Sequence, residues 1–243
     1  MSDKSVIGLN LLCNFDGLMC SGFAEPLLHR WVGFLESLDA VPLIVPAVPD
    51  AADVMCQLDR LDAFLYMGWR DLAPESDAHG PEAVEHNPET LLMRTIAERR
   101  MPFFGFGRGI QLLNVALGGS LRPVLLDTRP CHRHLDPHNP RHSLMTTSGS
   151  FLDRVYTDPE LLVQGHHEVA VDEVAVGFAI TARGPGGVIE AIESESEDWL
   201  AIGVQFYPDP HIAGLDERLL AAFLNESRAR TFAPKCGAVA SPC

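Results

Sequence analysis

Two kinds of segment alternate along the first half of the chain. Short apolar runs of strand length are followed by longer segments in which apolar residues recur every three or four positions, the spacing of one face of a helix. This pattern predicts strands at residues 6–13, 41–45, 62–67 and 103–106. It predicts helices at residues 25–38, 51–61, 89–100 and 108–117. Strands and helices that alternate in this way favour a parallel sheet with helices on both of its faces.

The pattern changes in the second half of the chain. Residues 175–181, 187–193 and 200–206 are strand-like and are joined by Gly-rich or acidic turns, so we expect them to add antiparallel strands to the sheet. The acidic run at residues 193–198 is predicted to be a solvated turn, and residues 216–228 a closing helix. We expect one domain over residues 1–232 and a flexible tail of small and polar residues over 233–243.

Composition narrows the classes of function. The 243 residues carry a formal net charge of −15, which argues against a nucleic-acid surface because phosphate binding needs clustered Lys and Arg. No run of 18 apolar residues is present, so neither a transmembrane helix nor a membrane partner is expected. The first residues lack the pattern of a signal peptide, which leads us to expect a cytoplasmic protein with mostly free thiols.

The most specific motif begins at residue 103 and reads F-F-G-F-G-R-G-I-Q-L-L-N-V-A-L-G-G-S-L. It resembles the nucleophile elbow of the γ-glutamyl-γ-aminobutyrate hydrolase (peptidase C26) branch of class I glutamine amidotransferases, where the pattern is roughly G-I-C-R-G-x-Q-L-L-N-V-A-L-G-G-T-L. Three further segments resemble motifs of that family, at residues 164–168, 187–193 and 203–209. The resemblance runs from about residue 4 to 230. It implies a flavodoxin-like class I glutamine amidotransferase domain, an α/β fold with a mostly parallel central sheet, helices on both faces and antiparallel strand additions.

The chain departs from the family pattern at the three catalytic positions. Gly107 stands where the family has its cysteine nucleophile, Tyr207 where it has a histidine, and Asp209 where it has a glutamate. Glycine offers no thiolate, so no acyl-enzyme can form, and a tyrosine with a pKa near ~10 is a poor general base at neutral pH. Glycine also tolerates the strained turn of an elbow without a Cβ penalty. We therefore expect a catalytically degenerate member of the family.

A second segment of the expected pocket lies after the strand at residues 62–67. Residues 67–74 read M-G-W-R-D-L-A-P and resemble the family's oxyanion segment, T-G-G-x-D-V-x-P. Gly68 and Trp69 are therefore candidate pocket residues. The indole of Trp69 stands where a small residue is usual, and two interpretations stay open: it fills part of the substrate pocket, or it packs beneath the long loop of residues 68–88.

Four more residues are candidates for the pocket. Arg108 follows the elbow directly and Gln111 lies one turn further along the helix. Backbone N–H groups at the start of this helix offer an anion site, which favours a ligand that carries a carboxylate. His166 and His167 belong to the segment that resembles N-S-x-H-H-Q, and we expect one of them to face the former active site and the other to be structural.

Histidines also gather before the second half of the sheet. Cys131, His132, His134 and His138 are weak candidates for a metal site, and His142 follows them closely. Their residue types suit a transition metal, but their spacing matches no standard zinc motif, so a solvated or substrate-facing loop is the favoured interpretation. No cofactor is expected, and a metal remains the open alternative.

Three functional hypotheses follow from these residues. The leading one is a non-hydrolytic protein that binds a small carboxylate-bearing ligand or a protein partner at the altered pocket. The first alternative is an enzyme with changed chemistry that uses Tyr207, Asp209, the histidines or a bound metal. The second is a non-catalytic scaffold or a subunit of an oligomer, including a homo-oligomer.

Overall fold

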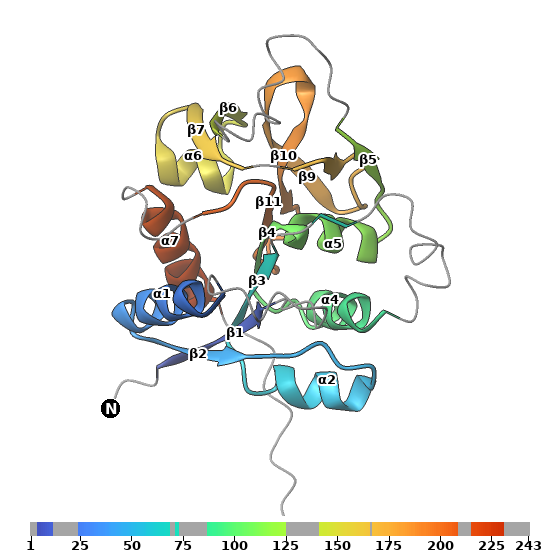
Figure 1. The fold of residues 1–243 in the computed structure, drawn as a ribbon, viewed down its shortest axis with the longest axis vertical. Coiled ribbons are helices and arrows are strands. Elements are labelled where there is room, and N and C mark those ends of the chain that lie inside the picture. Colours follow the sequence, from blue (N-terminus) through green and yellow to red (C-terminus); the bar gives the residue numbers. More distant parts are fainter. Residues whose placement is uncertain are drawn as a thin grey trace, which may run out of the picture.

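The structure is a computed structural model, and it describes residues 4–11, 24–68, 71–72, 87–124, 141–165, 167–208 and 215–230. A central sheet divides the molecule, and helices cover both of its sides (Figure 1). The parallel part of the sheet has the strand order β2 (Ala40–Ile44), β1 (Ser5–Leu11), β3 (Ala63–Gly68), β4 (Phe103–Gly107) and β11 (Ala201–Val204). This order confirms the parallel sheet that the alternating pattern predicts.

Antiparallel strands extend the sheet beyond β11. The order continues through β10 (Ile189–Ser194), β9 (Phe178–Arg183), β6 (Arg141–Thr146) and β7 (Glu160–Gln164). A side branch of β8 (Val169–Val171) and β5 (Leu121–Pro123) pairs with β10 through β8. The sequence pattern missed β5, β6, β7 and β8, which are short and lie among turns.

One strand direction in the prediction is wrong. We expected residues 200–206 to join the antiparallel additions, but β11 runs parallel to β4, and only its other edge pairs antiparallel with β10. β11 is therefore the strand at which the sheet changes from parallel to antiparallel. Its direction depends on the strands beside it, and an apolar strand sequence carries no such information.

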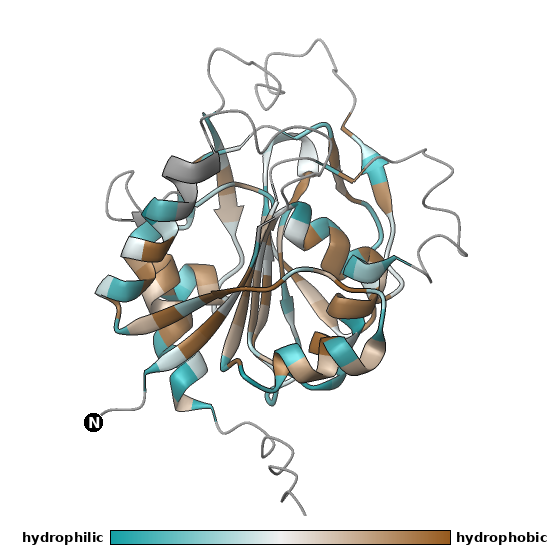
Figure 2. Cartoon of the chain, turned by 60° about the horizontal axis from the view of Figure 1, so that its bottom comes forward, coloured by the Kyte–Doolittle hydropathy of each residue, from teal (hydrophilic) through white to brown (hydrophobic). Residues whose placement is uncertain are grey.

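The helices separate into two layers. On one face lie α1 (Ala24–Ser37), α6 (Phe151–Tyr156) and α7 (Leu215–Ala229), and on the other lie α2 (Ala51–Leu58), α4 (Pro88–Glu98) and α5 (Arg108–Ala116). Alternate residues of β4 serve the two layers: Phe104 and Phe106 join the core under α1 and α7, and Phe103 joins the core under α4 and α5. Figure 2 shows apolar colour along central strands and on parts of the helices that flank them. Because β4 is covered by helices on both faces, its residues must be apolar on both faces, which explains the continuous F-F-G-F sequence.

Local signals set the helix boundaries well. Asn87 caps α4 by accepting a hydrogen bond from Glu89 N at 2.8 Å, and Pro88 occupies the first helical position. The short helix α6, which the sequence pattern missed, is capped by Ser150 and also by Glu193, whose carboxylate accepts from Phe151 N at 2.9 Å. Glu193 and Ser194 belong to β10 and are partly buried, so the prediction of a solvated acidic turn is wrong at its first two residues. Among the described helices, none is long and apolar enough to cross a membrane.

Candidate functional site

The predicted elbow is a direct junction between strand and helix. β4 ends at Gly107 and α5 begins at Arg108, with no loop between them. Gly107 has φ 57° and ψ −114°, a backbone conformation that residues with a side chain rarely adopt. Gly68, the last residue of β3, is its register partner on the neighbouring strand. The turn thus has the sharp geometry of a nucleophile elbow, and Gly68 lies beside Gly107.

The space beside Gly107 is occupied by Tyr207. A Cβ atom added to Gly107 would overlap the Cε1 atom of Tyr207 and the carbonyl oxygen of Gly68, and would lie 2.9 Å from Tyr207 Cζ, a separation that real Cβ atoms essentially never show. The phenol ring therefore stands where a side chain at the elbow would begin. The structure thus brings together two of the three positions, 107 and 207, that the motif resemblance aligns with the family's catalytic residues.

Tyr207 is held in place by its backbone and its burial. Its N–H donates to the carbonyl oxygen of Gln164 at 2.9 Å, and its ring packs against the core beneath α1 and α7. Burial raises the pKa of Tyr207 far above its ordinary value, and the negative charge of Asp71 raises it further. The phenol therefore stays protonated at physiological pH.

Arg108 points its charge into the protein. Its guanidinium forms an ion pair with the Glu89 carboxylate at 2.6 Å, and the Tyr66 hydroxyl donates to the other oxygen of that carboxylate at 2.7 Å. Burial by itself lowers the pKa of Arg108, but the contributions of Glu89 and Tyr66 together outweigh this effect, so the pKa lies above its ordinary value. The ion pair lies in a mostly buried site. Arg108 is thus a partner of Glu89 as well as a neighbour of the elbow.

Gln111 joins two segments near the elbow. The side chain is fully buried, and its Oε1 accepts from Leu72 N at 2.7 Å. Its Nε2 donates to Asp71 Oδ1 at 2.7 Å and to the carbonyl oxygen of Val169 at 3.1 Å. Asp71 in turn accepts from the backbone N–H groups of Glu168 and Val169 at 2.6 and 3.0 Å. Both amide hydrogens of Gln111 are used, so its described role is to hold the segment after β3 against β8.

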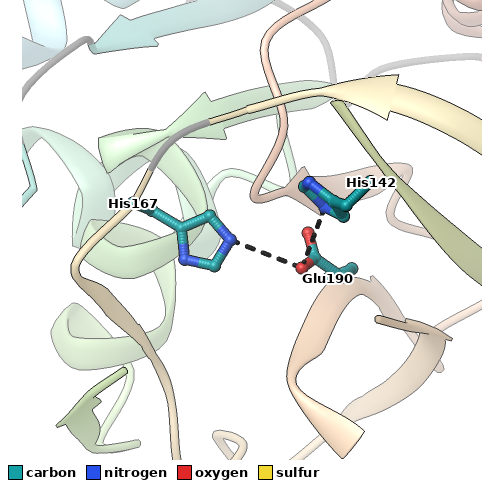
Figure 3. Close-up of side chains that lie close together, drawn as sticks. All are labelled: His142, His167 and Glu190. Atoms are coloured by element: carbon teal, nitrogen blue, oxygen red, sulfur yellow. Dashed lines mark ion pairs between the residues drawn. The ribbon is translucent and has the colours of Figure 1, made fainter. Parts of the chain in front are cut away.

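His167 lies in a buried cluster with His142 and Glu190 (Figure 3). The Nε2 atoms of His142 and His167 lie 3.2 and 3.4 Å from the same oxygen, Glu190 Oε1. Burial lowers the pKa of His167, but the hydrogen bond and charge of Glu190, with a smaller contribution from Asp71, raise it above its ordinary value. Sequence reasoning noted His142 only as a neighbour of the histidine-rich segment and gave Glu190 no role. A charged residue inside the otherwise apolar stretch V-I-E-A-I was the available signal for Glu190.

Comparison with known proteins decides the family. The family model described as Peptidase C26 matches residues 6–209. This chain belongs to the peptidase C26 family.

Two relatives are similar to this chain over about three quarters of its length. One, from Mycobacterium tuberculosis and named "Putative glutamine amidotransferase Rv2859c", is 33% identical over 195 residues, which cover 76% of this chain and 62% of the relative. This chain therefore spans less than two thirds of that protein's length. The other, a gamma-glutamyl-gamma-aminobutyrate hydrolase of Escherichia coli O157:H7, is 30% identical over 201 residues, covering 76% of this chain and 79% of the relative.

A solved structure has the same fold. A Thermoplasma acidophilum protein titled "a putative gmp synthase subunit a protein" superposes with a TM-score of 0.64, covering 94% of this chain and 96% of that chain at 14% identity. The mixed sheet with helices on both faces is therefore the class I glutamine amidotransferase fold, as the sequence motifs predicted.

The remaining predicted site residues lie outside the described part of this C26 chain. They are Trp69, His166 and Asp209 of the expected pocket and Cys131, His132, His134 and His138 of the histidine-rich segment. Of the predicted pocket, the structure places Gly68, Gly107, Arg108, Gln111 and Tyr207 around the end of β4, and His167 in the buried cluster.

Proposed function

We propose that this chain is a member of the C26 family that does not hydrolyse glutamine or γ-glutamyl amides by the family's thiol mechanism, and that it binds a small carboxylate-bearing ligand at the altered pocket. One observation carries the first part: the ring of Tyr207 fills the space into which a side chain at Gly107 would point. The assignment of these two positions to the nucleophile and the base rests on the motif resemblance.

The chemistry of the two positions supports this proposal. A glycine has no atom that can attack a carbonyl carbon, and in a comparable triad the loss of the nucleophile lowers turnover by about 10⁶. Among the described residues Cys56 is the one cysteine, and it lies exposed on α2 beside Arg60. Burial raises the pKa of Tyr207, so its hydroxyl is protonated at physiological pH and cannot accept a proton as a general base. This also argues against the alternative in which Tyr207 is a general base.

Hydrolysis assays test the loss of activity. We expect release of glutamate from glutamine and from γ-glutamyl-γ-aminobutyrate to stay at the background rate, with the E. coli γ-glutamyl-γ-aminobutyrate hydrolase measured in parallel as the active control. Turnover within about tenfold of that relative would contradict the proposal, since the expected deficit is on the order of 10⁶.

Restoring the missing groups gives a sharper test. We expect Gly107→Cys alone to remain inactive, because Tyr207 occupies the space of the new side chain. The combined variant Gly107→Cys, Tyr207→His and Asp209→Glu removes the phenol and supplies a thiol, an imidazole and a glutamate. It should react covalently with an electrophilic glutamine analogue, seen as a mass increase at residue 107, whereas Tyr207→His and Asp209→Glu without the cysteine should not.

The second part of the proposal concerns ligand binding. The first N–H groups of α5 have no side-chain cap at Gly107, and they lie at the ends of parallel strands, where ligands bind in such sheets. Arg108 is already paired with Glu89, so we assign carboxylate recognition to these backbone groups.

A thermal-shift comparison of glutamate, glutamine and γ-aminobutyrate, each with its methyl ester, tests this part. Stabilisation by an acid that its ester does not produce supports a carboxylate site. No stabilisation by any acid, together with a stable dimer or higher oligomer in sedimentation, would favour the scaffold hypothesis instead.

A further inference from the structure

Three side chains that commonly bind metal ions meet inside the antiparallel half of the molecule. His142 comes from β6, His167 precedes β8 and Glu190 comes from β10. They are 4%, 0% and 0% exposed. Figure 3 shows both imidazoles directed at the carboxylate from different sides. Three separate segments of the chain therefore bring two nitrogen ligands and one oxygen ligand to a single point.

The spacing of the atoms suits a tetrahedral ion. The two Nε2 atoms lie 3.2 and 3.4 Å from Glu190 Oε1, and the ligand atoms of the cluster all lie within 4.8 Å of one another. Zinc binds imidazole nitrogen at about 2.0–2.1 Å and carboxylate oxygen at about 2.0–2.2 Å, so neighbouring ligands of a tetrahedral site stand roughly 3.3–3.5 Å apart. The two measured separations lie in or close to that range.

The charge of the buried carboxylate also favours a bound cation. A fully buried carboxylate is costly unless a positive charge compensates it. A divalent cation placed where the three ligands converge would compensate the charge of the buried Glu190 carboxylate.

We propose that His142, His167 and Glu190 form a structural binding site for one divalent transition-metal ion, with zinc the best match to two imidazoles and one carboxylate. The described residues supply three of the four ligands usual at zinc. The ion ties β6, the segment before β8 and β10 together. Glu190 also accepts a backbone hydrogen bond from Gln205 N at 2.8 Å, so the site is joined to the segment that holds Tyr207. The proposal is independent of whether the elbow is active.

Metal analysis of the full-length chain, purified without a histidine tag, is the direct test. The chain is stripped with a chelator, dialysed against one equivalent of zinc, and measured for bound metal and melting temperature. We expect about one zinc per chain and a higher melting temperature than for the stripped chain. Cobalt in place of zinc should give the visible absorption of a tetrahedral ion. A stripped chain that takes up no zinc and melts at the same temperature with and without it would overturn the proposal.

Variants assign the site to residues. His142→Gln, His167→Gln and Glu190→Gln should each lower the zinc content at least tenfold, and far-UV circular dichroism checks that they fold. His29→Ala, on the exposed surface of α1, is the matched control and should leave zinc content unchanged. The histidine-rich segment is tested by the combined variant Cys131→Ser, His132→Ala, His134→Ala and His138→Ala. If that variant loses the zinc while His167→Gln and Glu190→Gln keep it, the ion binds elsewhere and the proposed site is wrong.

Discussion

Replacing Gly107 by alanine should destabilise the fold by about 2–6 kcal/mol. A residue with a side chain held at this positive φ costs about 1–3 kcal/mol, and forcing an extra carbon into a packed site costs a similar amount. Both terms apply here, because Gly107 has φ 57° and an added Cβ would overlap Tyr207 and the carbonyl oxygen of Gly68. Urea denaturation measures the effect as a lower midpoint.

A double-variant cycle separates the two terms. Tyr207→Ala removes the overlap with the ring but leaves the backbone strain and the overlap with the Gly68 carbonyl oxygen, so Gly107→Ala should cost about 1–3 kcal/mol less in that background than in the wild type. Gly118 has φ 95° and open space around it, so the cost of Gly118→Ala gives the backbone strain without any overlap. Gly33→Ala, on the exposed face of α1, should stabilise the fold by about 0.5–1 kcal/mol. The reasoning is refuted if Gly107→Ala costs less than about 0.5 kcal/mol, or if its cost is unchanged within about 0.5 kcal/mol by Tyr207→Ala.

Three further predictions concern buried polar groups. Arg108→Met should lower the free energy of unfolding, measured by urea denaturation, by about 3–5 kcal/mol because it leaves the mostly buried Glu89 carboxylate without its ion-pair partner. Adding Glu89→Gln should recover part of this loss. The expectation is contradicted if the double variant loses the sum of the two single losses. Gln111→Leu should cost about 2–4 kcal/mol by the same assay, since it removes three buried hydrogen bonds, and a cost below about 1 kcal/mol would show that they contribute little. Burial raises the pKa of Glu193 in the folded protein. The contribution of this shift to stability is therefore complete below the unfolded pKa of about 4.3, and it is lost as the pH rises through the folded pKa. Glu193→Gln should therefore gain stability relative to wild type as pH rises from about 4 to about 7, and a constant difference would argue against a shifted pKa.

The elements of the parallel half were predictable because their determinants are local. Helix α5 was expected at residues 108–117 and lies at Arg108–Ala116, and α2 was expected at residues 51–61 and lies at Ala51–Leu58. Their apolar spacing and their caps lie within a few residues of each other along the chain. The elbow was predictable for another reason, since its motif matches the family pattern over many consecutive positions.

The antiparallel half was not predictable to the same degree. β6 and β7 are no shorter than the predicted strands β2 and β4, but they mix polar with apolar residues and leave one face largely exposed, and β8 has only three residues. Such segments lack the continuous apolar run that marks a strand such as β4, and their stability comes from partners that are distant in sequence.

The sequence by itself determined that Gly107 cannot be a nucleophile, because the absence of a side chain is a property of the residue and not of its surroundings. Only the tertiary structure decided that the Tyr207 ring stands where a side chain at residue 107 would begin and that His142 and His167 converge on Glu190. These contacts join residues on different strands, and their distances depend on strand order, direction and register, which are set by the packing of the whole sheet.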